Sequence, residues 1–138
     1  MVETTSRMLQ CTVVTPERAV LDETADFVAL PLYDGELGVL PGRAALIGRL
    51  GYGELRVRTG ARTERYYIDG GFAEVRSNAV TVLTPRAVRA QEIDVAAAEQ
   101  ALQVARTAVA PADQQAQQRA QERARAQLRI ARRRDGHE

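Results

Sequence analysis

The chain has 138 residues, a length that fits one ordinary domain or a small domain with an appendage. Its formal net charge is +1, so no overall field favours nucleic acid or an acidic membrane, and no apolar run reaches the roughly 18 residues that span a bilayer. All 19 basic residues are Arg and the only His is His137, which argues against lysine chemistry, His-based catalysis and a zinc site. We therefore expect no enzymatic activity of the chain by itself, no catalytic residue and no metal.

Residues 1–7 show no signal-peptide pattern, because no apolar core of that type follows them. We expect the protein to lie in the cytosol or to dock on a membrane complex from the cytosolic side. The next residues, 8–14, predict a strand. The only cysteine, Cys11, lies in this strand and cannot form an internal disulfide, so we expect a buried small hydrophobe rather than a nucleophile.

Up to residue 88 the chain consists of short apolar runs with a period of two, separated by Gly, Asp and Asn turn signals. The predicted strands are residues 27–33, 54–59, 65–69, 73–76 and 79–84. Short strands of this kind are typical of an antiparallel sandwich or barrel. We predict an N-terminal antiparallel β-sandwich over residues 1–88.

Residues 35–45, GELGVLPGRAA, combine three glycines and a proline with one acidic and one basic side chain. Gly permits positive φ and close backbone approach, whereas Pro fixes φ and removes a hydrogen-bond donor. The stretch predicts a shaped loop between strands, a setting in which partner contacts are often made. A tight turn with a bulge would explain the same spacing without any function.

From residue 90 the composition changes to Ala, Gln, Glu and Arg, which predicts a C-terminal antiparallel two-helix hairpin over residues 89–138. Asp94 is a suitable N-cap for a first helix over residues 95–109. Pro111 breaks the chain there and can occupy the first turn of a second helix, which would run to about Arg134. The chain is thus predicted to be a β-sandwich with a helical appendage.

The second predicted helix carries a narrow apolar stripe in which small residues recur every four positions. Its members are Ala112, Ala116, Ala120, Ala124 and Leu128. A buried methyl contributes roughly 0.8 kcal/mol against about 1.5–3 kcal/mol for a Leu side chain, so the helices are expected to form readily but dock weakly. A weakly docked hairpin could detach as a unit, or it could remain a fixed pair, and the sequence leaves both open.

Residues 112–138 carry seven Arg against four acidic residues, about three net positive charges. This basic helix could seek an acidic protein surface or a phosphate group, because the planar guanidinium fork suits both. It could equally be a solvated face without a partner. Nucleic acid is a third candidate, but this half has no aromatic side chains for stacking on bases, so we expect no nucleic-acid partner.

Several motifs, taken in order, resemble those of the epsilon subunits of F-type ATP synthases. Residues 35–42 (GELGVLPG) are similar to the family's GE(I/L)G(I/V)xPG loop. Residues 67–75 (YIDGGFAEV), followed by 80–83 (VTVL), are similar to its second signature, and residues 91–94 (QEID) match the start of its first C-terminal helix. Each motif is weak alone, but the ordered set covers nearly the whole chain. The resemblance implies a β-sandwich followed by a regulatory hairpin.

The resemblance implies a non-catalytic rotor part, in the central stalk, that couples proton translocation to ATP synthesis. Its expected partners are the gamma subunit and the c-ring, with contact to the membrane only through the complex, on the cytoplasmic side of a bacterial inner membrane. Glu36 takes the family position near the ring, with Gly38, Pro41 and Gly42 shaping the same loop.

The resemblance also implies that the hairpin can extend into the alpha/beta catalytic hexamer and block ATP hydrolysis. In the extended state the second helix sets basic residues against an acidic segment of the beta subunit. The candidates in this chain are Arg119, Arg123 and Arg129, whose placement on the helix can present them to a negative patch. A coupler without inhibition is the alternative.

Two positions depart from the family pattern. The family's His after Pro-Gly is Arg43 here, so no role of that imidazole carries over. Some bacterial members bind ATP through a motif (I/L)DxxRA, in which Asp94 matches the acidic residue but the Arg is Ala97. Arg123 could replace that cation in part, so a nucleotide site at Asp94 and Arg123 would be weak and no cofactor is expected. A nucleotide-sensing switch remains the other alternative.

Overall fold

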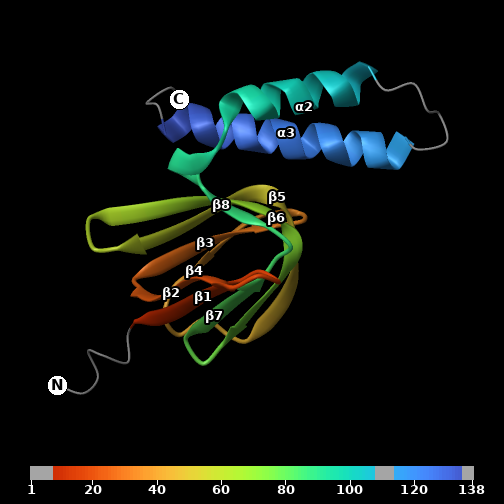
Figure 1. Cartoon of the computed structure of the whole chain (residues 1–138). Helices are drawn as coiled ribbons and strands as arrows, with labels where there is room; N and C mark the ends of the chain where they lie inside the picture. The colour runs from red at the N-terminus through yellow and green to blue at the C-terminus, as the bar shows by residue number, and fades with distance from the viewer. Residues whose placement is uncertain (1–7, 108–113, 135–138) are drawn as a thin grey trace.

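The computed structural model describes residues 8–107 and 114–134, and within these ranges the alternating segments form eight strands and the Ala-rich half forms two α-helices (Figure 1). The strands are β1 (Leu9–Val14), β2 (Ala19–Ala25), β3 (Phe27–Leu32), β4 (Gly35–Val39), β5 (Leu46–Thr59), β6 (Arg62–Arg76), β7 (Ala79–Leu83) and β8 (Ala87–Arg89). They are followed by a short 3-10 helix, η1 (Ala90–Glu92), and by the helices α2 (Val95–Thr107) and α3 (Gln114–Arg134). Figure 1 shows both helices stacked on one side of the strands.

The described strands join in one sheet with the order β2-β1-β7-β6-β5-β3-β4, and β8 pairs with β6 outside this path. The predicted fold class, a β-sandwich followed by a two-helix hairpin, is confirmed. One pair differs from the antiparallel expectation, because β1 and β7 run parallel from Gln10 opposite Ala79 to Val14 opposite Leu83. A parallel pair requires a long connection, and all the strands from β2 to β6 supply it.

The two longest strands, β5 and β6, form a ribbon that runs through the domain. The sequence predicted separate strands with breaks at the glycines of this region. The pairing instead continues through them, with Leu50 opposite Gly71 and Tyr52 opposite Asp69. Gly70 and Gly71 have φ of +78° and +104°, so they bend β6 without ending it.

The bend also changes which side chains of the ribbon face the core. On β6 the core residues include Ile68 before the glycines and Ala73 after them. Since successive side chains of a strand alternate between its faces, this odd spacing means that the inward face switches at the bend. β5 switches in the same way between Leu50 and Leu55. Each half of the ribbon thus serves a different part of the sandwich, and the outward face that carries Tyr67 receives the hairpin.

The first part of the predicted glycine-rich loop is a strand. Residues 35–39 form β4, which pairs with β3 along its whole length. The prediction of a loop is therefore wrong for these five residues, because pairing with β3 and burial of Val39 outweigh the weak strand propensity of glycine. Gly38 also permits a close approach, since a Cβ there would lie only 2.9 Å from the Phe27 ring.

The second part of that stretch, residues 40–45, lies at the end of β4 that is remote from Glu36. Gly42 N–H donates a hydrogen bond of 2.8 Å to the side-chain oxygen of Asn78, so this turn is tied to the connection between β6 and β7. From Glu36 to Val39 the strand extends about 10 Å, at roughly 3.3 Å per residue. Glu36 and Gly42 therefore belong to different ends of the sheet.

Cys11 lies in the core with none of its surface exposed, so the prediction of a buried small hydrophobe is confirmed. Burial, aided by the nearby Glu23 and Asp22 carboxylates, raises the pKa of the Cys11 thiol from 9.0 to about 12. A thiol of this kind is protonated and shielded at neutral pH. It is therefore a poor nucleophile in the folded state.

We expect Cys11 of the native chain to react with an aromatic disulfide reagent at pH 8 at least about 100-fold more slowly than in guanidinium chloride. The unfolded thiol ionises from about pH 9 and the folded thiol only near its pKa of about 12, so the unfolded state binds fewer protons between these values. The free energy of unfolding therefore falls as the pH rises through this window, and Cys11→Ala flattens that part of the profile. Equal labelling rates in the two states would contradict the prediction.

The start of the first helix is as predicted. The Ala97 N–H donates a hydrogen bond of 3.0 Å to Asp94 Oδ1, which makes Asp94 the N-cap of α2. The predicted break at Pro111, the stripe residue Ala112 and the terminal His137 lie outside the described residues.

Candidate functional site

The hairpin docks on the sheet through a small apolar cluster that is separate from the sandwich core. Its buried members are Tyr67, Ala90, Ile93, Ala126, Ile130 and Ala131. Ala126 and Ala131 have at most 1% of their surface exposed, so α3 approaches the Tyr67 ring closely. Ile130 is the largest α3 side chain in this contact. We call these residues the docking cluster.

The described part of the predicted Ala stripe lies on the row of α3 that contacts α2, and at its C-terminal end this row continues to Ala131 of the docking cluster. Gln117 donates a hydrogen bond of 2.7 Å to the Ala105 carbonyl oxygen of α2, and the buried Ala124 lies two helical turns further along the same row. Ala126 lies on roughly the opposite side of α3, because two residues turn a helix by about 200°. α3 therefore has two buried rows, of which the sequence reasoning followed one.

A carboxylate of the sheet holds the C-terminal end of α3. Glu54 on β5 pairs with Arg65 of the neighbouring β6, and Arg133 Nη1 lies 2.8 Å from Glu54 Oε1. Arg65 also donates a hydrogen bond of 3.2 Å to the Ile130 carbonyl oxygen. Only 9% of the Glu54 side chain is exposed, so this carboxylate is largely removed from water and its two arginine partners offset that cost.

A second carboxylate holds the middle of α3. Arg123 Nε lies 3.1 Å from Asp69 Oδ1, and its guanidinium lies 5.0 Å from the centre of the Tyr52 ring. The Tyr67 hydroxyl donates a hydrogen bond of 2.5 Å to the same Asp69 oxygen. Burial raises the pKa of the Tyr67 phenol, and this hydrogen bond raises it further, so Tyr67 remains a donor at neutral pH.

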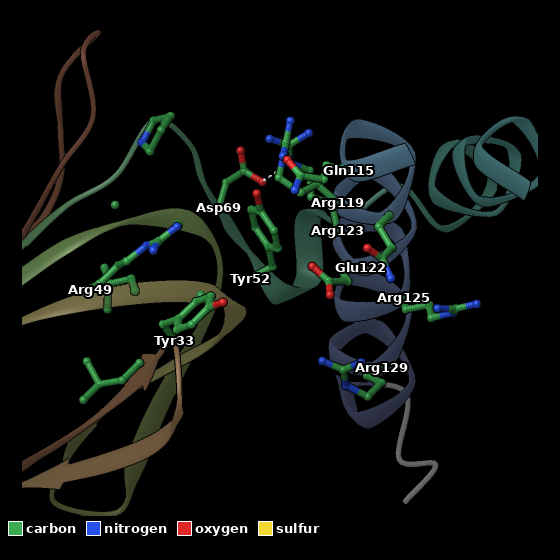
Figure 2. Close-up of a pocket in the computed structure, with 17 residues that line it drawn as sticks. Tyr33, Arg49, Tyr52, Asp69, Gln115, Arg119, Glu122, Arg123, Arg125 and Arg129 are labelled. Atoms are coloured by element: carbon green, nitrogen blue, oxygen red, sulfur yellow. Dashed lines mark ion pairs between the residues drawn. The ribbon is translucent and has the colours of Figure 1, made fainter. Parts of the chain in front are cut away.

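An open cavity of about 870 Å³ lies between the sheet and α3 beside these ion pairs (Figure 2). The described arginines that line it are Arg49, Arg119, Arg123, Arg125 and Arg129. Figure 2 shows Arg123 reaching toward Asp69 and Arg125 pointing away from the sheet. A cleft in which arginines outnumber the carboxylates attracts anionic groups, whether on a protein or on a small molecule.

The structure brings the three predicted contact residues of α3 to this one cavity. Arg119 and Arg129 line it, and Arg123 lines it while paired with Asp69. In the docked state these three arginines border the cavity toward the sheet of the same chain, while Arg119 and Arg129 remain exposed to solvent. Arg129 also borders a second cavity of about 350 Å³, together with Glu36.

The residues predicted for the ring contact and for nucleotide do not gather in one place. Glu36 accepts a hydrogen bond of 3.1 Å from Arg56 and keeps 51% of its side chain exposed, near the turn that joins β3 and β4. Gly42 lies in the turn at the other end of β4. Asp94 caps α2 and does not line the cavity that holds Arg123, so the structure does not join the two predicted nucleotide residues in that cavity.

Sequence reasoning missed the two sheet carboxylates that hold α3. Glu54 and Asp69 stand at outward positions of β5 and β6, where a charged residue is the ordinary choice for contact with water. The only available signal was that an excess of arginines on the second helix needs acidic partners. Which carboxylates pair with these arginines depends on how α3 is placed over the sheet. Local sequence patterns do not specify this placement.

Fold and site together define a β-sandwich protein that carries a docked helix pair on the outer face of its sheet. Residues 8–90 match the family model described as ATP synthase, Delta/Epsilon chain, beta-sandwich domain. The chain therefore belongs to the delta/epsilon chain family of ATP synthases. The resemblance of its sequence to the epsilon subunits is confirmed.

Relatives by sequence carry the name ATP synthase epsilon chain. That of Rhodopirellula baltica is 59% identical over 86 residues, which cover 62% of this chain and 67% of the relative. That of Carboxydothermus hydrogenoformans is 48% identical over 98 residues, which cover 71% of this chain and 73% of the relative.

Solved structures show the same architecture over nearly the whole chain. A chain of the Euglena gracilis mitochondrial ATP synthase, in a structure of OSCP, F1 and c-ring, matches with a TM-score of 0.71 at 26% identity and covers 94% of this chain and 81% of its own length. A chain of the Tetrahymena thermophila central stalk and c-ring matches with a TM-score of 0.66 at 16% identity, covering 89% and 96%, and shows the fold alone.

In the part of the chain that the structure describes, neither helix is long and apolar enough to cross a membrane.

Proposed function

We propose that the chain is a central-stalk subunit of an F-type ATP synthase that couples proton translocation to ATP synthesis. The observation that carries the proposal is the likeness to a chain of the Euglena ATP synthase assembly, which covers sandwich and hairpin together. The family match over residues 8–90 supports it independently. The chain then acts without catalysis of its own, as a peripheral part of the membrane complex on the cytoplasmic side of a bacterial inner membrane.

In this proposal the sandwich binds the gamma subunit and rests on the c-ring. Glu36 supplies the ring contact, because it lies near the β3–β4 turn with half of its side chain exposed. Gly38 brings β4 close to the Phe27 ring and so shapes that edge. Pro41 and Gly42 shape the turn at the other end of β4. A partner contact at this turn is therefore distinct from the ring contact of Glu36.

The hairpin has an inhibitory role in the same proposal. Arg119, Arg123 and Arg129 bind an acidic segment of the beta subunit when the hairpin extends into the alpha/beta hexamer. Support comes from the docked structure, in which these arginines already lie at a shared cavity and one of them pairs with a carboxylate. The docking cluster is small, and α3 contributes only Ala126, Ile130 and Ala131 to it, so we expect release of the hairpin at a moderate free-energy cost.

Two experiments test these parts separately. Pulldown of the tagged full chain from native membranes is expected to recover gamma and c-ring subunits, and recovery of no ATP synthase subunit overturns the central-stalk proposal. Deletion of residues 89–138 is expected to raise ATP hydrolysis by the assembled complex. If hydrolysis does not rise, the protein is a coupler without inhibition.

A nucleotide-sensing switch is the second candidate, and the arginine-lined cavity favours it. The family's motif Arg is Ala97 here, and Asp94 is engaged as a helix cap, so we expect ATP to bind no more tightly than the millimolar range. Titration calorimetry of the full chain with ATP decides the matter. Binding weaker than millimolar removes the sensing role at ordinary nucleotide levels.

A further inference from the structure

In the two ion pairs that the described residues form between sheet and hairpin, the sheet supplies the acidic groups and the hairpin the basic groups. Glu54 and Asp69 belong to the sheet, whereas Arg133 and Arg123 belong to α3. The two arginines are ten positions apart, which is about 15 Å along the helix. Two separated attachment points fix both the position and the direction of α3 on the sheet.

Both carboxylates keep a partner of their own when α3 leaves. Glu54 retains its ion pair with Arg65, and Asp69 retains the hydrogen bond from the Tyr67 hydroxyl. A buried carboxylate that lost every partner would oppose release strongly. Because neither does, breaking the two helix pairs costs only their own contribution.

The arginines of α3 cannot serve two carboxylate surfaces at once. Arg123 pairs with Asp69 in the docked state, and it is also one of the residues that the proposed function sets against an acidic partner. The sheet carboxylates therefore occupy the place that an external acidic surface would take. Binding of that surface and docking of α3 are in direct competition.

We propose that Glu54 and Asp69 form an acidic latch that holds α3 on the sandwich and is displaced by an acidic partner surface. The latch rests on the proposed inhibitory role of the hairpin, and it assigns the control of that role to two residues of the sheet. The strength of this latch sets the fraction of molecules in which the hairpin is extended. A chain with a weakened latch extends more readily and meets the partner with less competition.

Single-molecule energy transfer between two dyes on the full chain measures the ratio of undocked to docked hairpin, which reports the strength of the latch. Dyes are attached to cysteines at Thr63 and Gln100, two exposed positions on the sheet and on α2, in a Cys11→Ala background. Glu54→Gln and Asp69→Asn are each expected to raise the ratio of undocked to docked hairpin about tenfold, since each removes a charge-assisted contact.

Variants on the helix side complete the test and avoid any change to the sandwich. Arg133→Gln is expected to raise the ratio about as much as Glu54→Gln, and the double variant little more than either alone. Arg125→Gln is the matched control, because it makes the same change on the same helix at a residue that borders the cavity but whose side chain points away from the sheet carboxylates (Figure 2). We expect it to alter the ratio less than twofold.

Competition is tested with a short Glu-rich peptide as the probe. The peptide is expected to raise the undocked fraction of the unaltered chain at low salt and to lose most of this effect in Arg123→Gln. The latch is overturned if Glu54→Gln, Asp69→Asn and Arg133→Gln leave the ratio within twofold, or if Arg125→Gln raises it as much as they do. An undocked fraction that the peptide does not change overturns the competition.

The outcome for the latch is distinguishable from the outcome for the proposed function. The latch is measured on the isolated full chain, whereas inhibition is measured as hydrolysis by the assembled complex. If deletion of residues 89–138 leaves hydrolysis unchanged while Glu54→Gln undocks the hairpin, the inhibitory function fails and the latch stands. If deletion raises hydrolysis while Glu54→Gln leaves the hairpin docked, the latch fails and the inhibitory function stands.

Discussion

Replacement of Gly71 by Ala is expected to lower the free energy of unfolding by at least about 3 kcal/mol, and to leave much of the chain unfolded at 37 °C. Gly71 has φ of +104°, a conformation that an L-residue with a side chain adopts only under strain. A Cβ at this position would lie 2.0 Å from the Leu83 carbonyl oxygen and 2.9 Å from Thr84 Cα. Both neighbours are backbone, so the clash cannot be relieved by a side-chain rotation.

The matched control for this prediction is Gly60→Ala. Gly60 also has positive φ, +63°, but a Cβ there would meet no atom within 4 Å. Only the strain of the left-handed conformation remains, about 1 kcal/mol. Urea denaturation followed by circular dichroism measures both variants. Equal losses of stability in the two would show that the Leu83 contact does not matter.

Ile130→Asp is expected to detach α3 from the sheet while the sandwich stays folded. Ile130 has 3% of its surface exposed and is the largest α3 side chain in the docking cluster, so the substitution places a carboxylate among apolar groups. Loss of the buried side chain and desolvation of the charge together cost about 4 kcal/mol or more, and we expect this cost to outweigh what the remaining members of the small docking cluster contribute. Amide hydrogen exchange is expected to show loss of protection over α2 and α3, with β5 and β6 still protected.

Val104→Asp on α2 is the control, because it puts the same carboxylate in place of an apolar side chain that is 61% exposed. We expect protection of both helices to change little in this variant. If Ile130→Asp left the exchange of α3 as slow as in the unaltered chain, the docking cluster would not be what holds the hairpin. If it exposed β5 and β6 as well, sandwich and hairpin would unfold as one unit.

The fold was largely predictable because its signals are local. The period-two alternation indicates the strands, and Asp94 marks the start of the first helix without any knowledge of the rest of the chain. The errors arise where a segment distant in the sequence determines the local structure. Residues 35–39 form a strand only because β3 lies beside them, and Gly70 and Gly71 bend a strand that their composition would end.

The candidate site was predictable only from the side of the helix. The arginine excess of the second helix pointed to acidic partners, and Arg119, Arg123 and Arg129 do lie at one cavity. Their counterparts on the sheet, Glu54 and Asp69, have no signature of their own, since a charged residue at an outward strand position needs no partner. The tertiary placement of α3 over the sheet selects them.

The continuous β5–β6 ribbon is expected to stiffen the domain against bending and twisting along its length. Fourteen residues of β5 and fifteen of β6 are paired over nearly their full length, and the pairing continues on both sides of the bend. A twisting load applied to the edge formed by β3 and β4 is carried through β5 and β6 to β7 by backbone hydrogen bonds. We therefore expect the sandwich to resist twisting as one body.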